Sequence, residues 1–564
     1  MIKKWEVKNK SNVDKRKLQE KIQKDFGLSN LLSQILVNRG IETEEEIRVF
    51  LNPTRADFHD PFLMPDMDKA VERILQAIQQ KEKIIIYGDY DVDGITSITV
   101  LKQFLEERGL EVSSYIPNRL EEGYGLNKKA VEWIASQGFD LMITVDCGIS
   151  GIEEVEYASS LGIETVITDH HEPLDILPNA VAVVDPKIQT SMYPFRGLAG
   201  VGVVFKTIQA IGKKLQLPEK EYLKYLDIVC IGTISDIVPL VDENRVITKL
   251  GLKLVERTQN IGLKELIEAS GYRKIDSTMV SFGIAPRINA CGRMGQEQEA
   301  LQLFLTKDRK EAKQITEKLN EYNKQRQTIE KEILEEAIQK VEQEPKSPCI
   351  VLGDEKWHHG VIGIVSSKIT DLYFKPSILV CFEENIGKGS GRSIPGFDLH
   401  EALGKCSNYL EKYGGHEMAV GVTLKKENFI PFKKAFETVV NESHIENLMP
   451  VIAIEEQIDL KEITIGTVKE LNLLEPFGEA NKMPIFMFHN LKIDSIRSLS
   501  EGKHLKLTLK DDHLLVGAIG FNMGHLAEEY LIGDRVDVAG ILEINSFNGM
   551  DSIQINIKDM RKTY

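Results

Sequence analysis

The chain has 564 residues, of which 42% are hydrophobic and 28% charged, and its formal net charge is −16. This length exceeds what one hydrophobic core usually supports, so we expect about three domains. The opening residues form no apolar signal region, and no run of about 18 apolar residues occurs, which argues against export and against a membrane span.

The cysteines and the net charge indicate the cellular compartment and limit the kinds of nucleic-acid binding that we expect. The six cysteines lie far apart and form no CxxC pair, so reduced thiols in a cytoplasmic protein are the simplest interpretation. The acidic balance argues against non-specific coating of duplex DNA. It does not exclude a nucleic-acid enzyme, because phosphate binding depends on the local potential at a groove rather than on the molecular total.

Residues 1–80 are charged and mostly helical in pattern, for example at Leu31–Val37, with a proline-punctuated stretch from Asn52 to Pro65. We interpret them as a helical N-terminal lead-in that packs on the first domain.

Residues 81–307 alternate apolar strands with helical stretches such as Thr96–Glu107, the pattern of a two-sided parallel sheet in an α/β domain. The first strand, from Lys83, runs into GDYDVDG, with aspartates at alternate positions. Such carboxylates repel one another, and hard divalent cations are the usual reason that a fold tolerates them. The alternative is a solvated acidic turn.

Three more apolar runs close on acidic or imidazole groups: Leu141–Gly148, Glu164–His171 and Ile228–Asp236. We predict a strand for each, with all four strand ends meeting at the carboxyl edge of one sheet. Oxygen-rich ligands with one imidazole favour Mn²⁺ or Mg²⁺ over zinc in a two-metal site. A lone His is more often structural, but the shared pattern favours a ligand here.

The stretch from Asp308 to Glu344 has no Pro or Gly and carries apolar residues at helical spacing. It predicts one amphipathic helix of about 50 Å that connects two domains. A coiled-coil dimerisation helix is the alternative.

Two further domains are expected after this helix. Residues 345–445 read as a second α/β domain, with strands at Ile350–Leu352 and Ser377–Val380. Residues 446–564 alternate in three strands, a helix and two strands, the order of an OB-fold barrel that commonly binds single strands. A purely structural β-barrel is the alternative.

Several motifs together resemble a known superfamily. GDYDVDG, VDCG, ITDHH and ISDIVPL occur in the order of motifs one to four of the DHH phosphoesterases. GSGRS and GGHEMA resemble the DHH-associated domain that closes over the site. APRINACGRM and WHHGVIG resemble the RecJ family of single-strand-specific 5′→3′ exonucleases. The likeness covers residues 30 to 560 approximately, and the ordered set is very specific.

The resemblance implies a metal-dependent 5′→3′ exonuclease that hydrolyses phosphodiester bonds of single-stranded DNA to 5′-mononucleotides in recombination and repair. Two divalent ions, Mn²⁺ or Mg²⁺, about 3.5–4 Å apart, would generate hydroxide, neutralise the phosphate and stabilise the leaving oxygen. The implied partner is single-stranded DNA, with a single-strand-binding protein and a helicase as further candidates. We expect no membrane partner, a monomer and a cytoplasmic location.

The same resemblance suggests roles for individual residues. Tyr87 stands where related pyrophosphatases and small phosphodiesterases have a histidine ahead of the first aspartate pair. The catalytic candidates are Asp89, as a ligand or through water, Asp169, as an orienting group, and His171, as a contact to the phosphate or leaving oxygen. The candidate metal ligands are Asp91, Asp93, Asp146, His170 and Asp236, with Asp146 the best candidate to bridge both ions. The candidate substrate-binding residues are Arg119, Arg287, Asn289, Arg293, His359, Ser390, Arg392 and His416.

Alternatives remain at several of these positions and for the function. Surface salt bridging would explain Arg119 or His359, and backbone hydrogen bonding would explain His171. A DHH phosphodiesterase for short oligonucleotides or dinucleotides is one alternative function, although such relatives are typically shorter and lack an OB barrel. The other is a non-catalytic DHH-domain scaffold, against which the intact acid and imidazole set argues.

Overall fold

The computed structural model describes residues 3–8, 13–119, 121–344, 346–547 and 549–563. The chain forms two compact units. The sheet unit consists of Phe58–Pro239 and Ile247–Leu448, and the barrel unit of Met1–Asp57, Leu240–Val246 and Met449–Tyr564. Among the described residues, no helix is both long and apolar enough to cross a bilayer.

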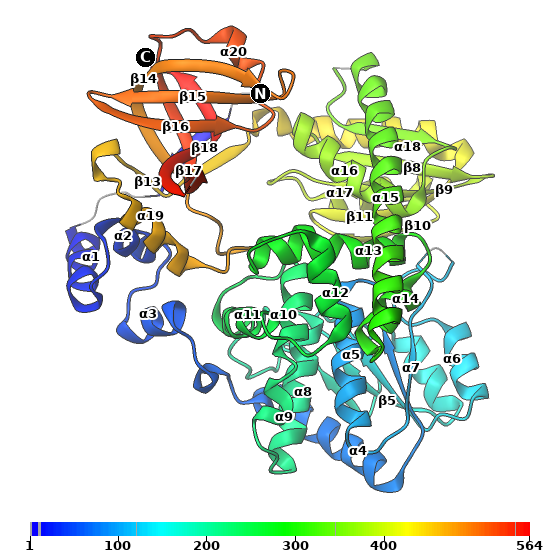
Figure 1. Cartoon of the computed structure of the whole chain (residues 1–564). Coiled ribbons are helices and arrows are strands. Elements are labelled where there is room, and N and C mark those ends of the chain that lie inside the picture. The colour runs from blue at the N-terminus through cyan, green and yellow to red at the C-terminus, as the bar shows by residue number, and fades with distance from the viewer. Residues whose placement is uncertain (1–2, 9–12, 120, 345, 548, 564) are drawn as a thin grey trace. The chain divides into compact units, whose positions relative to one another are not determined.

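The first half of the sheet unit is built on a five-stranded parallel sheet of order β3-β2-β4-β5-β6 (Figure 1). Its strands are β2 (Ile84–Gly88), β3 (Val112–Tyr115), β4 (Leu141–Val145), β5 (Glu164–Thr168) and β6 (Ala182–Val184). Every residue of β2 and β4 is buried, as expected for strands that helices cover on both faces. The predicted parallel α/β domain is confirmed.

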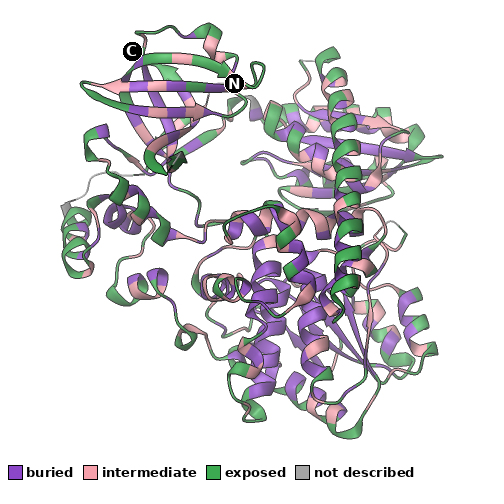
Figure 2. Ribbon diagram, viewed as in Figure 1, coloured by how far each residue is buried: buried purple, intermediate pink, exposed green. Residues whose placement is uncertain are grey.

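Helices cover both faces of this sheet. On one face, Ile85 and Tyr87 of β2 pack in a cluster with residues of α6 (Lys128–Ser136) and α7 (Ile152–Ser160). On the other, α5 (Val92–Glu106) and α8 (Gly200–Lys214) contact the strands, and α10 (Leu226–Ser235) packs on both of these helices. Figure 2 shows buried residues concentrated in these strands and helices. The edge of the sheet that carries the acidic motifs is therefore fixed by a well-packed core.

The remaining helices of this half follow the chain towards the second half, and α11 (Asp242–Val255) begins with residues of the barrel unit. They are α4 (Met67–Gln80), α9 (Lys220–Leu223), α11, α12 (Ile261–Ser270), a π-helix (Met279–Ile284), α13 (Ala285–Arg293), α14 (Glu297–Leu305) and α15 (Arg309–Gln343). Helix α15 begins after Asp308, whose side chain accepts the Lys310 N–H as an N-cap. Its buried stripe packs on α12, α13 and α14 in one half and on α16 in the other, which makes it the predicted connector.

The second half of the sheet unit is a mixed sheet of order β10-β11-β9-β8-β7, in which only β7 and β8 pair in parallel. Its elements are β7 (Ile350–Asp354), α16 (His359–Tyr373), β8 (Ser377–Glu383), β9 (Ile386–Arg392), α17 (Leu399–Lys405), β10 (Lys412–His416), β11 (Ala419–Lys425) and α18 (Phe429–Glu442). The predicted second α/β domain is confirmed.

The barrel unit contains the predicted OB-like barrel, whose strand order β14-β15-β16-β18-β17 closes through a β14–β17 pairing. Its elements are β1 (Lys4–Val7), α1 (Val13–Phe26), α2 (Asn30–Asn38), α3 (Glu44–Leu51), β12 (Val451–Ile454), β13 (Glu456–Gln457), α19 (Ile465–Glu470), β14 (Phe486–Leu499), β15 (His504–Asp511), β16 (Leu514–Gly520), α20 (Leu526–Glu529), β17 (Arg535–Phe547) and β18 (Met550–Lys562).

The N-terminal residues differ from the sequence-based expectation. Only the later part, including α4, packs against the parallel sheet. Residues of α1, α2 and α3 share one hydrophobic core with the barrel, and β1 pairs in parallel with β12. Helical periodicity identifies a buried face, but it does not say which distant segment covers that face.

A buried arginine joins the segment Leu240–Val246 to the rest of the barrel unit by hydrogen bonds. Arg245 is 2% exposed, and its guanidinium lies 3.6 Å from the centre of the Phe50 ring. It donates to the carbonyl of Phe50 at 2.7 Å, and to those of Leu474 and Glu475 at 3.1 and 3.0 Å. Burial lowers its pKa to about 9, which still leaves it cationic at neutral pH. These bonds tie the segment Leu240–Val246 to the residues around Phe50 and Glu475.

Replacing this cation should destabilise the barrel unit. We expect Arg245→Met to lower the free energy of unfolding by about 2–4 kcal/mol, because buried carbonyls lose their donors. Urea unfolding followed by pulse proteolysis measures this, with the exposed Arg257→Met as the matched control. Equal midpoints for the two variants would show that the buried hydrogen bonds contribute nothing.

Candidate metal centre and active-site pocket

Acidic residues from distant parts of the sequence converge at the carboxyl edge of the parallel sheet. Asp89 follows β2, and Asp91 caps α5 by accepting the Gly94 N–H at 3.0 Å. Asp146 follows β4, and His170 lies two residues beyond β5. Three predicted strand ends therefore meet as expected.

The fourth predicted strand is wrong. Ile228–Ser235 belongs to helix α10, and Asp236 is its C-cap. A short run that is apolar on all sides has no periodicity that separates a buried strand from a buried helix, and this helix is enclosed by α5 and α8. The Asp236 carboxylate nevertheless reaches the same group.

The carboxylates surround one imidazole nitrogen. His170 Nε2 lies 3.1 Å from Asp146 Oδ1, 3.6 Å from Asp236 Oδ2 and 3.8 Å from Asp93 Oδ2. Possible ligand atoms lie within 4.8 Å of one another in three overlapping groups. These groups are Asp93, His170 and Asp236; Asp89, Asp91 and Asp146; and Asp146, His170 and His171. Their overlap gives room for more than one cation.

The electrostatics of the group call for positive charge. Burial and the neighbouring carboxylates raise the pKa values of Asp89, Asp146 and Asp236 well above the ordinary range, and raise that of Asp93 to about 7. Burial lowers the pKa of His170 to about 3, so its ring is neutral, the form that binds metals. A divalent cation would favour the ionised form of each aspartate and the neutral form of His170.

Several polar atoms of the group are left without partners. Among the described residues, no hydrogen-bond partner is present for Asp89 Oδ1, Asp146 Oδ1 or His170 Nε2, all of them buried. Buried polar atoms are otherwise satisfied in folded proteins, so these oxygens and this nitrogen are suited to metal coordination. The residues present therefore fit an Mn²⁺ or Mg²⁺ centre.

Backbone geometry places two of the carboxylates. Asp146 has a φ of 58°, a left-handed conformation that is uncommon outside glycine. Gly200 lies against it, since a Cβ on this glycine would come within 2.6 Å of Asp146 Oδ1. Asp93 accepts the N–H groups of Gly200 and Val201 at 2.7 and 2.8 Å, at the start of α8. The N-terminus of α8 thereby binds the Asp93 carboxylate, and the missing side chain of Gly200 leaves space for the Asp146 carboxylate.

Asp169 has a different role from the other aspartates, because all of its contacts are to protein donors. It accepts the N–H groups of Ile149, His170 and His171 at 2.9, 2.7 and 3.2 Å, and His171 Nδ1 lies 2.7 Å from it. Although burial opposes the charge, these contacts keep the pKa of Asp169 below its usual value. Burial also opposes charge on His171, yet Asp169 raises its pKa. Asp169 therefore orients His171.

A pocket of about 640 Å³ joins this group to a set of cations. Its lining residues are Asp89, Tyr90, Asp91, Arg119, Tyr124, Asp146, His171, Asp236, Asn289, Arg293, Arg392, Ala419 and Val420. The Arg119 guanidinium lies 4.8 Å from the centre of the Tyr90 ring. Burial and the nearby arginines lower the pKa of Arg293 to about 9. The lining thus combines carboxylates with three arginines.

Four predicted substrate-binding residues do not line this pocket. Arg287 is committed to structure, since it donates to the carbonyls of Gly283 and Ala269 and to Asn320 Oδ1, next to the π-helix. Ser390 Oγ accepts from Arg392 at 3.1 Å. His416 is exposed at the end of β10, and burial and the charge of Lys388 lower the pKa of His359 to about 4.

Two tyrosines at the pocket were not singled out by sequence reasoning. Tyr90 lies inside GDYDVDG, and Tyr124 lies between two glycines in EGYGL. Tyr87 donates to the Gly125 carbonyl at 2.9 Å and is buried in the α6–α7 cluster, so it does not join the metal group. Because tyrosine is common in protein cores, the residue type alone did not identify Tyr90 or Tyr124 as pocket residues. The two glycines beside Tyr124 were the one signal in the sequence, since they indicate an unusual loop.

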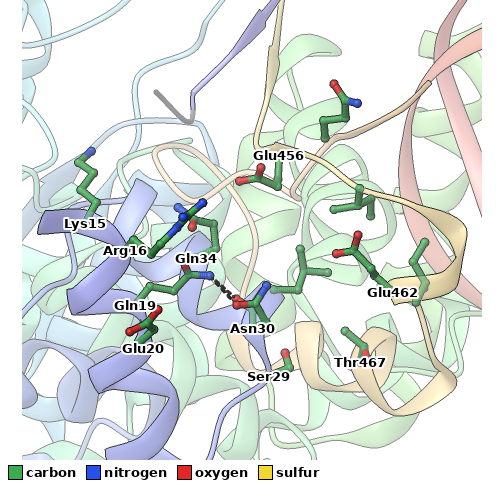
Figure 3. Close-up of a pocket in the computed structure, with 14 residues that line it drawn as sticks. Lys15, Arg16, Gln19, Glu20, Ser29, Asn30, Gln34, Glu456, Glu462 and Thr467 are labelled. Carbon is green, nitrogen blue, oxygen red and sulfur yellow. Dashed lines mark hydrogen bonds between the residues drawn. The ribbon is translucent and has the colours of Figure 1, made fainter. Parts of the chain in front are cut away.

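A second hollow, of about 610 Å³, lies within the barrel unit between α1, α2 and residues 456–467 (Figure 3). Its lining mixes cations such as Lys15 and Arg16 with Glu20, Glu456 and Glu462, and Gln19 donates to Asn30 across it. Among the described residues no imidazole lines this hollow, and its two cations face three carboxylates. It therefore lacks the combination of imidazole, carboxylates and arginines found in the sheet-unit pocket.

Comparison with known proteins agrees with this architecture. The DHH family N-terminal domain matches residues 83–233, the DHHA1 domain residues 328–442, and the RecJ OB domain residues 454–559. The crystal structure of RecJ in complex with Mn²⁺ from Thermus thermophilus has a TM-score of 0.87 at 30% identity, covering 100% of this chain and 80% of that one. The corresponding Mg²⁺ complex has a TM-score of 0.80 at 28% identity, with 100% and 79% covered.

Curated relatives give the same result. The single-stranded-DNA-specific exonuclease RecJ of Thermus thermophilus is 35% identical over 88% of this chain and 71% of that protein. The protein of the same name from Bacillus subtilis is 40% identical over 98% of this chain and 70% of its own length. On this evidence the chain belongs to the RecJ family.

Proposed function

We propose that this protein is a metal-dependent exonuclease that hydrolyses single-stranded DNA from its 5′ end to 5′-mononucleotides, in recombination and repair. The observation that carries the proposal is the pocket that joins buried, unpartnered carboxylates to a cluster of arginines. A phosphodiester is an anion that needs cations on its oxygens and a metal-activated nucleophile, and this pocket offers both. Relatives named as single-stranded-DNA-specific exonucleases support the substrate.

Five residues would hold two ions: Asp91, Asp93, Asp146, His170 and Asp236. Asp146 belongs to two of the three ligand groups, which supports it as the bridging residue. Asp89 belongs to one of them and has a free buried oxygen, which supports direct ligation. When bound, the ions supply activation of water and neutralisation of phosphoryl charge.

The protein's own groups would grip and orient the strand. Arg119, Arg293 and Arg392 present guanidinium forks that suit phosphate oxygens, and Asn289 lies beside them. His171, oriented by Asp169, faces the pocket and would donate to the phosphate or to the leaving oxygen. His359, Ser390 and His416 are proposed to contact the strand outside the pocket, and Arg287 to support it indirectly.

Neither alternative function is favoured. A phosphodiesterase for short oligonucleotides or dinucleotides would not need the OB barrel, which a family match supports at residues 454–559. A non-catalytic scaffold would not need the unpartnered ligand atoms.

Further parts of the proposal rest on the family resemblance. We propose catalysis in residues 81–307, closure by residues 345–445 through the connector 308–344, single-strand binding by residues 446–564, and support from residues 1–80. A monomer working in the cytoplasm with a single-strand-binding protein and a helicase completes the proposal. All six cysteines are free and buried, which agrees with a reducing compartment.

Loss of the bridging carboxylate should abolish activity. With Mn²⁺ and a single-stranded oligonucleotide, we expect Asp146→Asn to reduce turnover by about 1,000-fold or more, because both ions lose a ligand. Asp140→Asn is the matched control at the opposite end of β4, where Asp140 accepts the Lys83 N–H at 2.9 Å. Chelation of the parent enzyme should stop cleavage, and added Mn²⁺ should restore it. Near-parental turnover by a folded Asp146→Asn protein would refute the two-metal assignment.

End labelling tests the substrate and the direction of cleavage. Time courses should release labelled mononucleotides from a 5′-labelled single strand at the earliest points, whereas blunt duplex should resist, because a duplex about 20 Å across exceeds the pocket. The direction comes from the family alone. Early release from a 3′ label, or efficient cutting of a circular single strand, would overturn the proposal.

A further inference from the structure

One short loop brings an unassigned side chain to the active-site pocket. The Tyr124 loop, residues 121–127, follows Arg119 and precedes α6. The Tyr124 hydroxyl donates to the Asp146 carbonyl at 3.3 Å and lies 3.1 and 3.3 Å from the two ring nitrogens of His171. The two rings meet edge to face, with centres 5.5 Å apart. Tyr124 thus contacts both the proposed bridging residue and the proposed proton donor.

A carboxylate organises the loop from within. Glu122 accepts three hydrogen bonds: from the Asn118 N–H at 2.7 Å, from the Tyr115 hydroxyl at 2.8 Å and from the Asn127 amide at 3.0 Å. Asn127 also caps α6 by accepting the Ala130 N–H at 2.8 Å. The loop is therefore tied to β3 on one side and to α6 on the other.

Tyr87 provides the second anchor. Its hydroxyl donates to the Gly125 carbonyl at 2.9 Å and accepts from the Asn127 amide at 3.3 Å. Gly123 and Gly125 have φ values of 83° and 84°, a region that glycine adopts without strain, so the chain can reverse on both sides of Tyr124. Tyr87 therefore helps to fix the loop that carries Tyr124.

His171 needs such a contact, because its side chain is 37% exposed and the outer torsion of an imidazole is broad. Asp169 contacts only Nδ1 of the ring, whereas the Tyr124 hydroxyl lies within hydrogen-bond distance of both ring nitrogens and so adds a second restraint on the ring. Partners of this kind fix ring orientation, and a small misplacement of a reacting group is costly.

We propose that Tyr124 is a positioning residue of this nuclease, whose hydroxyl holds the His171 ring toward the scissile phosphate, and that Glu122 and Tyr87 hold Tyr124 in place. This inference rests on the proposed function.

The direct test is Tyr124→Phe, which keeps the ring and removes the hydroxyl. On a single-stranded oligonucleotide with Mn²⁺, kcat should fall by about 10- to 100-fold, while KM and the Mn²⁺ concentration for half-maximal activity change by less than about twofold. Tyr157→Phe is the matched control, since its hydroxyl donates to Glu132 at 2.9 Å on the exposed surface. Parental kcat for Tyr124→Phe would overturn the inference while leaving the exonuclease assignment intact. An inactive parent would refute the proposed function itself.

A double-mutant cycle separates positioning from general damage. In a His171→Gln background, Tyr124→Phe should lower kcat by less than about twofold, because its effect acts through the imidazole. Full additivity of the two losses would overturn the inference.

The anchors give a second, independent series. Glu122→Gln and Tyr87→Phe should each lower kcat in the same direction as Tyr124→Phe, whereas Glu121→Gln, an exposed carboxylate beside Glu122, should not. Melting temperatures are compared in parallel. Anchor variants that melt at lower temperature but retain parental kcat would show a purely structural loop and would overturn the inference.

Discussion

Repulsion between carboxylates is the constraint on which the sheet unit depends. Asp89, Asp91, Asp93, Asp146 and Asp236 gather in overlapping groups that also contain His170, and three of them, Asp89, Asp93 and Asp146, are nearly excluded from water. Two like unit charges 4 Å apart repel by about 4 kcal/mol at an effective dielectric constant of about 20. A fold can hold such a group only where protonation or a cation relieves it. The enclosed edge of a parallel sheet, with helices on both faces, supplies the rigidity, and divalent ions supply the charge.

The backbone also compensates part of this charge. Asp91 caps the N-terminus of α5, and Asp93 accepts two N–H groups at the N-terminus of α8, so the positive ends of two helix dipoles meet the anionic group. Asp146, by contrast, accepts no backbone hydrogen bond at its buried Oδ1 among the described residues, and it has a left-handed conformation that its surroundings must enforce. This oxygen is therefore available to a metal.

Sequence patterns predicted most of the fold, because β2, β4 and β5, the connector helix and the barrel strands have a clear period or clear ends. The exceptions share a physical cause. An all-apolar run at Ile228–Ser235 has no period, so strand and helix were indistinguishable, although Asp236 still reached the group. The motif around Arg287 gave a residue type suited to phosphate, but the guanidinium satisfies carbonyls beside a π-helix that no local pattern reveals. Tyr124 was missed because its role comes from hydrogen bonds that converge in space.

The lining of the pocket combines two kinds of charged group that each need a partner of opposite sign. Carboxylates form one group, while in the other burial and the charge of Arg119 lower the pKa values of Arg293 and Arg392. The three arginines come from the loop after β3, from α13 and from β9, so the second sheet contributes directly to the cationic group. Divalent ions would relieve the carboxylates, and a phosphodiester backbone would relieve the arginines. A net charge of −16 therefore does not prevent binding of a polyanion, because binding depends on the local charges of the pocket rather than on the total charge of the molecule.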